Sequence, residues 1–229
     1  MKKIALLLLA FSATASAEMT TIFRNDESQR SFFGITDSLN HMRLSQAAPD
    51  SVLMLGDSIT QGLSYQGLRF KHVNLGVGGD TAHGLKTRIK NVDIDKYRGV
   101  FIEIGTNNIL MGEPGPFAGM EIAEAIDYAA PKAKNLFVSE VVISNRKLHP
   151  DLPADAPAVN DIIKTTCAKY KNCKFIPLPA GLVDEHGLNQ KYALPDGIHL
   201  NGKGYALWKE QLNKSMAEFP YSLYYKYFK

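Results

Sequence analysis

The sequence predicts an α/β fold in which a mostly parallel sheet carries helices on both faces. Two patterns support this prediction. From residue 51 onward, short apolar runs alternate with longer stretches that repeat apolar residues at helical spacing. The chain has 229 residues, 45% of them hydrophobic and 21% charged, which is typical of a folded globular protein. Sheets of this kind place their functional residues at the carboxyl ends of the strands.

The first 17 residues have the pattern of an export signal. A Lys-Lys pair stands at positions 2 and 3, residues 4–11 form an apolar run, and residues 15–17 match the small-x-small pattern that signal peptidase recognises. The apolar run is far shorter than the ~20 residues of a membrane-spanning helix. We therefore expect residues 1–17 to be a signal peptide that is cleaved after Ala17. The mature protein would be periplasmic or secreted, without an integral membrane segment.

Residues 18–229 are predicted to form a single domain that begins with a helical preface over residues 18–50. Within the preface, a helix is expected from about Asp26 to Ala47, because apolar residues recur along it as a loose stripe. We expect this stripe to pack against the rest of the domain. Its members are Phe32, Phe33, Ile35, Leu39, Met42 and Leu44.

Five strands are expected after the preface, in short apolar runs separated by helical patterns. They span residues 52–55, 73–75, 100–104, 136–138 and 175–178. Amphipathic helices are expected between the later strands, because apolar residues recur at i, i+3, i+4 and i+7 from Ile122 to Ala129. The same spacing recurs from Val159 to Thr166.

A last helix is expected to begin after Asn201, because asparagine is a good N-cap. Pro220 would end this helix. Its buried stripe would consist of Tyr205, Trp208, Leu212 and Met216.

The charge balance argues against nucleic acid as a partner. Lys and Arg number 26 against 23 Asp and Glu, so the formal net charge is +3. Two of the cations lie in the predicted signal peptide, which leaves a nearly neutral domain. Binding to duplex nucleic acid requires Lys and Arg clustered on one face, and a nearly neutral domain does not supply such a face.

The chain contains two cysteines, Cys167 and Cys173, which lie six positions apart. Because an exported protein meets oxidising conditions, a local disulfide between them is favoured. Two free thiols are the alternative. Metal binding would require more Cys or His ligands nearby, so no metal site is expected.

Four polar or glycine-rich runs carry the chemistry, and three of them directly follow predicted strands. They are residues 56–60, 74–80, 105–108 and 196–199. A serine hydroxyl becomes a nucleophile when an imidazole accepts its proton and a carboxylate orients that imidazole. Ser58, His199 and Asp196 supply these three groups, so together the runs indicate acyl transfer.

The tetrahedral intermediate of acyl transfer also needs hydrogen-bond donors for its oxyanion. The amides of Ser58 and of the 78–79 turn, and the carboxamide of Asn107, are suitable donors. Asp57 and Asp80 are interpreted as acceptors that stabilise turns rather than as catalysts. Glu103 lies within a predicted strand, where a carboxylate needs a buried partner that the sequence does not identify.

These runs resemble the four signature blocks of the SGNH (GDSL-type) hydrolase superfamily, and they occur in the family's order. The resemblance covers residues 52 to about 208. It implies a flavodoxin-like three-layer α/β/α sandwich with a five-stranded sheet, and no cofactor. The residues that it assigns are Ser58 as nucleophile, Ser58, Gly79 and Asn107 as the oxyanion hole, Asp196 as acid and His199 as base.

Within the superfamily, the runs at 74–81 and 105–108 are most similar to platelet-activating-factor acetylhydrolase and carbohydrate O-acetylesterases. The expected function is therefore an exported serine ester hydrolase that removes short acyl groups, above all acetyl, from a small-molecule or glycan ester. Arg146 and Lys147 follow the fourth predicted strand and are candidate substrate-binding residues, because fixed cations can recognise a carboxylate or phosphate. A solvated loop is the alternative for both.

Three other functions remain open at this point. A lysophospholipase or a broad-specificity arylesterase would use the same chemistry. A glycan-binding module without turnover, or a flavin- or nucleotide-binding protein, could share the fold. The set of Ser58, Asp196 and His199 favours an enzyme over a glycan-binding module. A colourless purified protein without bound nucleotide would distinguish it from a flavin- or nucleotide-binding protein.

Overall fold

The structure is a computed structural model that describes residues 27–217, so the predicted signal peptide and Pro220 lie outside it. Its central sheet has five parallel strands in the order β2-β1-β3-β4-β5. Each strand overlaps one of the predicted runs, which confirms the predicted sheet and makes it parallel throughout. The strands are β1 (Val52–Gly56), β2 (His72–Asn74), β3 (Gly99–Glu103), β4 (Leu136–Ser139) and β5 (Cys173–Ile176).

Side chains of the central strands alternate between two hydrophobic cores, one on each face of the sheet. In β1, Leu53 and Leu55 belong to the first core, whereas Val52 and Met54 belong to the second. The strands β3 and β4 alternate in the same way. These strands read as continuous apolar runs because both faces of a parallel sheet are covered.

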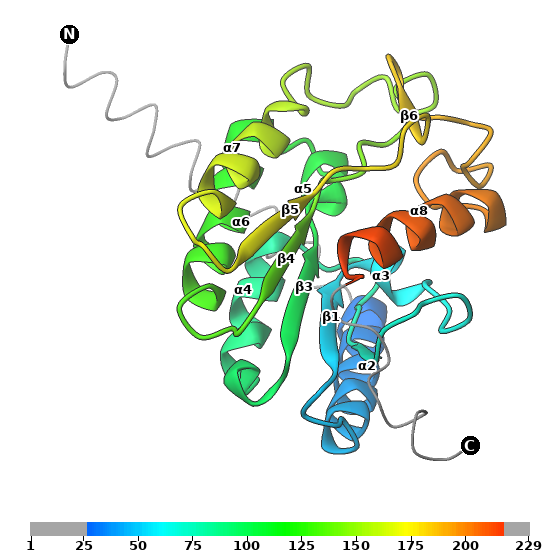
Figure 1. The fold of residues 1–229 in the computed structure, drawn as a ribbon. Helices are drawn as coiled ribbons and strands as arrows, with labels where there is room; N and C mark the ends of the chain where they lie inside the picture. Colours follow the sequence, from blue (N-terminus) through cyan, green and yellow to red (C-terminus); the bar gives the residue numbers. More distant parts are fainter. Residues whose placement is uncertain (1–26, 218–229) are drawn as a thin grey trace, which may run out of the picture.

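Helices cover both faces of the sheet, as Figure 1 shows. The first core is covered by α4 (Ala82–Arg88), α6 (Gly115–Ala129), α7 (Ala158–Cys167) and the end of α2 (Glu27–Ser45). The second core is covered by α3 (Ser58–Gln61) and α8 (Gly202–Ser215). The predicted three-layer α/β/α sandwich is therefore confirmed.

The remaining elements are short, and the sequence analysis did not identify them. They are η1 (Ile89–Asn91), η2 (Ile94–Lys96), α5 (Thr106–Leu110), and the antiparallel pair β6 (Val183–Asp184) and β7 (Gly187–Leu188). Elements of two to five residues are too short to show a period in the sequence. Among residues 27–217, no helix is long and apolar enough to cross a membrane.

The apolar stripe predicted for α2 does not pack as expected. The helix forms at nearly the predicted residues, but Phe32, Ile35, Leu39 and Met42 are exposed. The buried side chains of this helix include Thr36 and Asn40, and the Asn40 carboxamide donates to the Leu75 carbonyl over 3.1 Å. The helix thus docks partly through polar contacts with the chain after β2, which the apolar pattern could not indicate.

The last helix follows its prediction at the amino end. The Asn201 side chain accepts hydrogen bonds from the amides of Lys203 and Gly204, at 2.9 and 3.0 Å. Trp208 and Leu212 are fully buried, as predicted. The helix ends at Ser215.

The predicted disulfide is present. Cys167 and Cys173 are bonded with an S–S distance of 2.02 Å. Because Cys167 ends α7 and Cys173 begins β5, the bond closes the short turn between these two elements.

Candidate active site

Three loops with predicted functional residues meet at one edge of the sheet. Ser58 follows β1, Gly79 follows β2 and Asn107 follows β3. These strands are neighbours in the order β2-β1-β3, so their carboxyl ends are adjacent. The strand order reverses at β1, because β2 lies on one side of it and β3 on the other, and ligands of open α/β sheets bind at such a switch point.

The turn that carries Ser58 is held by the residues on either side of it. Asp57 is the N-cap of α3, and its Oδ1 atom accepts the Ile59 amide over 2.9 Å. This contact confirms the prediction that Asp57 stabilises a turn. At Gly56, a Cβ atom would collide with the Thr60 side chain and the Glu103 carbonyl, so only glycine allows the close approach.

His199 connects Ser58 to Asp196, although 141 positions separate Ser58 from His199. The Nε2 atom of His199 lies 2.9 Å from Ser58 Oγ, and Nδ1 lies 2.7 Å from Asp196 Oδ2. The structure thus brings together the three side chains that the sequence selected. In this arrangement one ring nitrogen can accept the serine proton while the other donates to the carboxylate.

The Asp196 carboxylate is held by hydrogen bonds to its ionised form. Its Oδ1 atom accepts the amides of Ile198 at 2.9 Å and His199 at 3.0 Å. Partial burial raises the pKa of Asp196, but the hydrogen bonds from the His199 ring and from the two amides outweigh it, so the pKa lies below its usual value. The side chains of His199 and Asp196 are 35% and 41% exposed, so the site is open to a substrate.

The loop after β2 presents the second candidate oxyanion group. Gly79 has a φ of 74°, a left-handed conformation that favours glycine. The neighbouring Gly78 amide donates to the Gln61 side chain over 2.9 Å, which fixes the loop against α3. Among the hydrogen bonds of residues 27–217, none engages the amide of Gly79 or of Ser58.

Asn107 lies beside this loop. Its Nδ2 atom donates to the Asp80 carbonyl over 2.8 Å. A carboxamide nitrogen carries two hydrogens, so one remains for a substrate oxygen. The first hydrogen bond orients the side chain from α5 toward the loop that contains Gly79.

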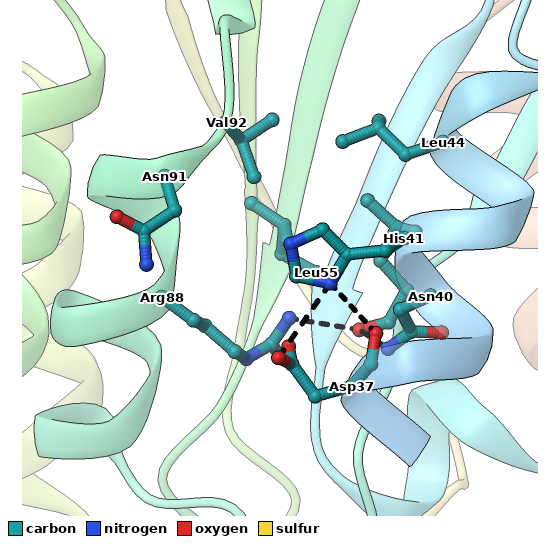
Figure 2. Close-up of a pocket in the computed structure, with 9 residues that line it drawn as sticks. Asp37, Asn40, His41, Leu44, Leu55, Arg88, Asn91 and Val92 are labelled. Carbon is teal, nitrogen blue, oxygen red and sulfur yellow. Dashed lines mark hydrogen bonds and ion pairs between the residues drawn. The ribbon is translucent and has the colours of Figure 1, made fainter. Parts of the chain in front are cut away.

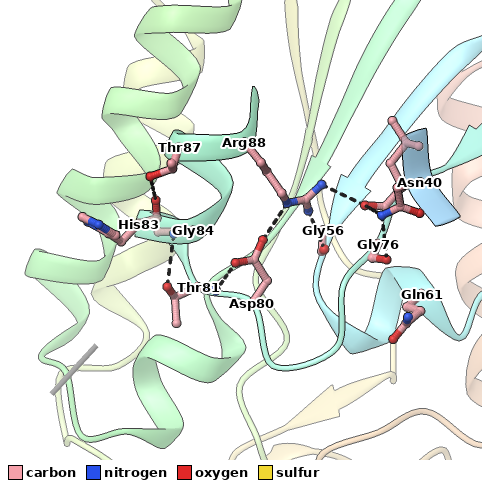
Figure 3. Close-up of polar contacts among 12 residues, drawn as sticks. Asn40, Gly56, Gln61, Gly76, Asp80, Thr81, His83, Gly84, Thr87 and Arg88 are labelled. Carbon is pink, nitrogen blue, oxygen red and sulfur yellow. Dashed lines mark hydrogen bonds and ion pairs between the residues drawn. The ribbon is translucent and has the colours of Figure 1, made fainter. Parts of the chain in front are cut away.

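Arg88, which the sequence analysis did not select, ties these loops together (Figure 3). Its Nε atom donates to Asp80 Oδ2 over 2.7 Å, in an ion pair whose side chains are 10% and 0% exposed. Its terminal nitrogens donate to the carbonyls of Leu75 at 2.8 Å and Gly56 at 2.9 Å. One guanidinium therefore joins the end of β1 to two points of the loop after β2, the loop that contains Gly79.

A small pocket lies next to Arg88, between α2 and the segment of residues 88–92 (Figure 2). The predicted catalytic residues do not line it. Its lining residues are Asp37, Asn40, His41, Leu44, Leu55, Leu75, Arg88, Asn91 and Val92. In the described part of the chain, no group of three or more His, Cys, Asp or Glu side chains could hold a metal ion.

The loop after β4 lies against the loop of residues 196–199, which carries Asp196 and His199. The His149 ring donates from Nε2 to the Asp196 carbonyl over 2.7 Å, and the Asn145 amide donates to Gly197 over 2.8 Å. No spacing in the sequence identifies Asp196 as the partner of His149, because the two residues are 47 positions apart.

The two candidate substrate-binding cations differ in their surroundings. The Arg146 guanidinium donates to the carbonyls of Leu152 at 3.2 Å and Pro153 at 2.8 Å, so it stabilises its own loop. Lys147 is exposed. Of the two, Lys147 has the freer side chain for contact with a substrate.

A family model and curated relatives both match this chain, and both are of acylhydrolases. Residues 54–207 match the model of the GDSL-like lipase/acylhydrolase family. The chain is 30% identical to subunit alpha2 of platelet-activating factor acetylhydrolase IB from Rattus norvegicus. This likeness extends over 167 residues, which are 69% of this chain and 72% of the relative.

Solved structures share the fold at lower identity. A lipase/acylhydrolase from Enterococcus faecalis matches with a TM-score of 0.58 at 18% identity, covering 73% of this chain and 96% of that one. A variant of an acetyl-xylooligosaccharide esterase from Geobacillus matches with a TM-score of 0.57 at 17% identity, covering 74% and 95%.

Proposed function

The chain belongs to the GDSL-like lipase/acylhydrolase family and is a serine ester hydrolase, and on this basis we propose that Ser58, His199 and Asp196 are its catalytic triad. The observation that carries the proposal is the continuous contact from Ser58 Oγ to His199 and from His199 to Asp196, at 2.9 and 2.7 Å. Both distances are those of hydrogen bonds between a nucleophile, its base and an orienting acid.

The reaction begins when Ser58 Oγ attacks the ester carbonyl carbon. Nε2 of neutral His199 accepts the serine proton, and ionised Asp196 stabilises the imidazolium that forms. The tetrahedral intermediate then expels the alcohol, which takes the proton from His199. Water attacks the acyl-enzyme by the same route and releases the carboxylic acid and the free serine.

The oxyanion is stabilised by the amides of Ser58 and Gly79 and by the Asn107 carboxamide. Support for these roles comes from the two amides, which no hydrogen bond within residues 27–217 engages, and from the hydrogen bond that orients Asn107 on Asp80. Donors held in place before the reaction stabilise the developing charge without reorganisation.

The substrate is an ester with a short acyl group, above all acetyl, on a carbohydrate or glycan. Two proteins similar to this chain carry acetyl in their names, the acetylhydrolase and the acetyl-xylooligosaccharide esterase. The predicted signal peptide directs this activity to the periplasm or the exterior. Hydrolysis rates on acetyl and long-chain nitrophenyl esters test the acyl preference, and a higher rate on long chains would favour a lysophospholipase or broad arylesterase.

Ser58→Ala tests the mechanism. Turnover of an acetyl ester is expected to fall by a factor on the order of 10³ or more, because the nucleophile is removed while the fold remains. Ser38→Ala is a matched control, since Ser38 is an exposed serine on α2 that bonds only its own helix. Retained activity in a folded Ser58→Ala protein would eliminate both the serine mechanism and the triad.

A further inference from the structure

Two fully buried carboxyl groups, Asp57 and Glu103, lie near Ser58 at the ends of β1 and β3, and the proposed mechanism uses neither. Asp57 immediately precedes Ser58, and Glu103 ends β3 in register with Gly56 of β1. Both side chains are 0% exposed. Within residues 27–217, no basic side chain forms an ion pair with either of them. Two buried carboxylates without a counter-ion are costly, which favours binding of a proton.

Each carboxyl group uses one oxygen in a known hydrogen bond. Asp57 Oδ1 accepts the Ile59 amide, and Glu103 Oε2 accepts the Thr60 hydroxyl, both at 2.9 Å. The other two oxygens, Asp57 Oδ2 and Glu103 Oε1, have no partner within the described residues. The two carboxyl groups belong to one cluster, because Glu103 lies in register with Gly56, the residue before Asp57, and binds Thr60 on the short helix that Asp57 caps. Two carboxyl oxygens can bond only when one of them carries a proton.

The electrostatics of the pair agree with this geometry. Burial raises the pKa of Glu103 to about 7, although hydrogen bonds from Thr60 oppose the shift. Burial, and then the charge of Glu103, raise the pKa of Asp57 well above its usual value. Two like charges in one buried cluster disfavour each other, so the electrostatics favour a pair that retains one proton.

We propose that Asp57 and Glu103 hold one proton between Asp57 Oδ2 and Glu103 Oε1, and that this shared proton positions the turn that carries Ser58. Asp57 stands immediately before the nucleophile, and Glu103 binds Thr60, two positions after it. The proton therefore fastens both sides of the turn to β3. Asp57 and Glu103 act as positioning residues, and neither touches the substrate.

Loss of the shared proton would disturb the turn. The titratable groups that face the pair are His199, Asp80 and Tyr205. Burial raises the pKa of Tyr205, so its hydroxyl stays protonated while it donates to the Ile59 carbonyl at 2.9 Å. Two adjacent negative charges would repel each other in the buried space. Turnover should therefore decline at alkaline pH along a limb that belongs to the pair.

Infrared difference spectroscopy tests the proton without measuring turnover. At about pH 6, the spectrum of the wild type minus that of the double variant Asp57→Asn/Glu103→Gln is expected to show one protonated-carboxyl band and one carboxylate band, whichever residue holds the proton. Glu124→Gln is the matched control, because Glu124 is 62% exposed and paired with Lys86, and it should change carboxylate bands alone. Loss of two carboxylate bands without a protonated-carboxyl band in the double variant would mean that both groups are ionised, which overturns the proposal.

Kinetics of two variants test the positioning role, which rests on the proposed function of Ser58. A glutamine at position 103 can accept the Thr60 hydroxyl and donate to Asp57, as the shared proton does, whereas an alanine can do neither. Glu103→Ala is expected to lose at least about tenfold more kcat than Glu103→Gln, with similar KM values. The alkaline limb should be absent in Glu103→Gln.

Equal losses of kcat in the two folded variants would overturn the positioning role, and so would an unchanged alkaline limb in Glu103→Gln. If Glu103→Ala does not fold, the limb of Glu103→Gln decides. Failure of the proposed function is a separate outcome: a fully active Ser58→Ala protein would end the triad and leave the infrared result standing.

Discussion

The loop of residues 196–199 holds both members of the proposed acid–base pair, Asp196 and His199, within four consecutive residues. One carboxylate oxygen of Asp196 accepts a hydrogen bond from the His199 ring. The other oxygen accepts hydrogen bonds from two backbone amides. Gly197 has a φ of 68°, which lets the chain turn back so that both contacts form at once. The orientation of the imidazole is therefore fixed locally, and only its second nitrogen depends on a distant residue, Ser58.

Asp196→Asn should lower turnover by about 10⁴-fold and move the acid limb of the pH–rate profile to lower pH. The carboxylate favours the imidazolium form of a neighbouring histidine, and it also selects the ring tautomer that accepts the serine proton. Because the pKa of Asp196 lies below its usual value, Asp196 itself stays ionised across the acid limb. The measurement is kcat against pH on a soluble acetyl ester, with folding checked at each pH.

The control for this prediction is His186→Ala, which should leave the limb in place. His186 lies on the turn between β6 and β7, beside Glu185. His149 is a poorer control, because its ring contacts the Asp196 carbonyl. If Asp196→Asn matched the wild type in rate and limb while His186→Ala abolished the limb, the assignment of Asp196 and His199 would be wrong.

The loops after β1 and β2 are fastened to each other by α4. Arg88, the last residue of that helix, binds Asp80 on the oxyanion loop and the Gly56 carbonyl two positions before Ser58. A charged donor with several nitrogens can hold a carboxylate and two carbonyls at once, which no neutral side chain of similar size can do. Loop geometry at this edge therefore depends on one helical residue.

Arg88→Met should lower kcat by at least about tenfold with a smaller change in KM, because it loosens the oxyanion loop rather than removing a substrate contact. Stability should also fall by about 3–5 kcal/mol, since the buried Asp80 carboxylate loses its guanidinium partner. Steady-state kinetics and denaturant unfolding measure the two effects. Arg69→Met is the control, because Arg69 is 77% exposed, and an unchanged kcat in folded Arg88→Met would contradict the expectation.

The disulfide braces elements at the opposite end of the sheet. Cys173 begins β5, so the bond lies at the amino end of a strand, whereas the candidate catalytic loops lie at carboxyl ends. Reduction should lower stability by at most about 2–3 kcal/mol, because the closed loop is small. Turnover should persist. Thermal unfolding and turnover are measured with and without reductant and compared with those of a Cys167→Ser/Cys173→Ser protein. Loss of turnover at a temperature where the reduced protein is still folded would contradict this expectation.

Across the whole molecule, the sheet is sealed between two apolar cores, and this isolation controls the charges at its centre. Glu103 lies on a strand between Ile102 and Ile104, both buried. Burial raises its pKa from 4.5 to about 7. The environment that makes the sheet stable therefore also raises the pKa of its central carboxyl groups.

Folding stability should consequently respond to pH through this pair. A carboxyl group whose pKa is higher in the folded state stabilises the fold fully below its unfolded value of 4.5, and the contribution is lost as pH rises through about 7. Between pH 5 and pH 8, the wild type should lose roughly 3 kcal/mol relative to Glu103→Gln. Urea unfolding of both proteins at the two pH values checks this, and parallel pH dependences would refute it.

The sequence alone predicts the strands, the main helices and the edge of the sheet where the site lies. Residues 52–55 and 100–102 are apolar without interruption, and this pattern occurs because each strand is buried on both faces. Local periodicity encodes local structure and burial, so these elements can be identified without coordinates. The family resemblance likewise selects Ser58, Asp196 and His199 from the residues of the chain.

Only the tertiary structure decides which distant groups meet. It turns most of the apolar stripe of α2 outward, pairs Arg88 with Asp80, and sets Glu103 against Thr60. A sequence pattern records how often an apolar side chain recurs, but a buried polar contact depends on the path of the chain through space. Contacts across 43 positions, as between Thr60 and Glu103, leave no period in the sequence, so the structure alone reveals them.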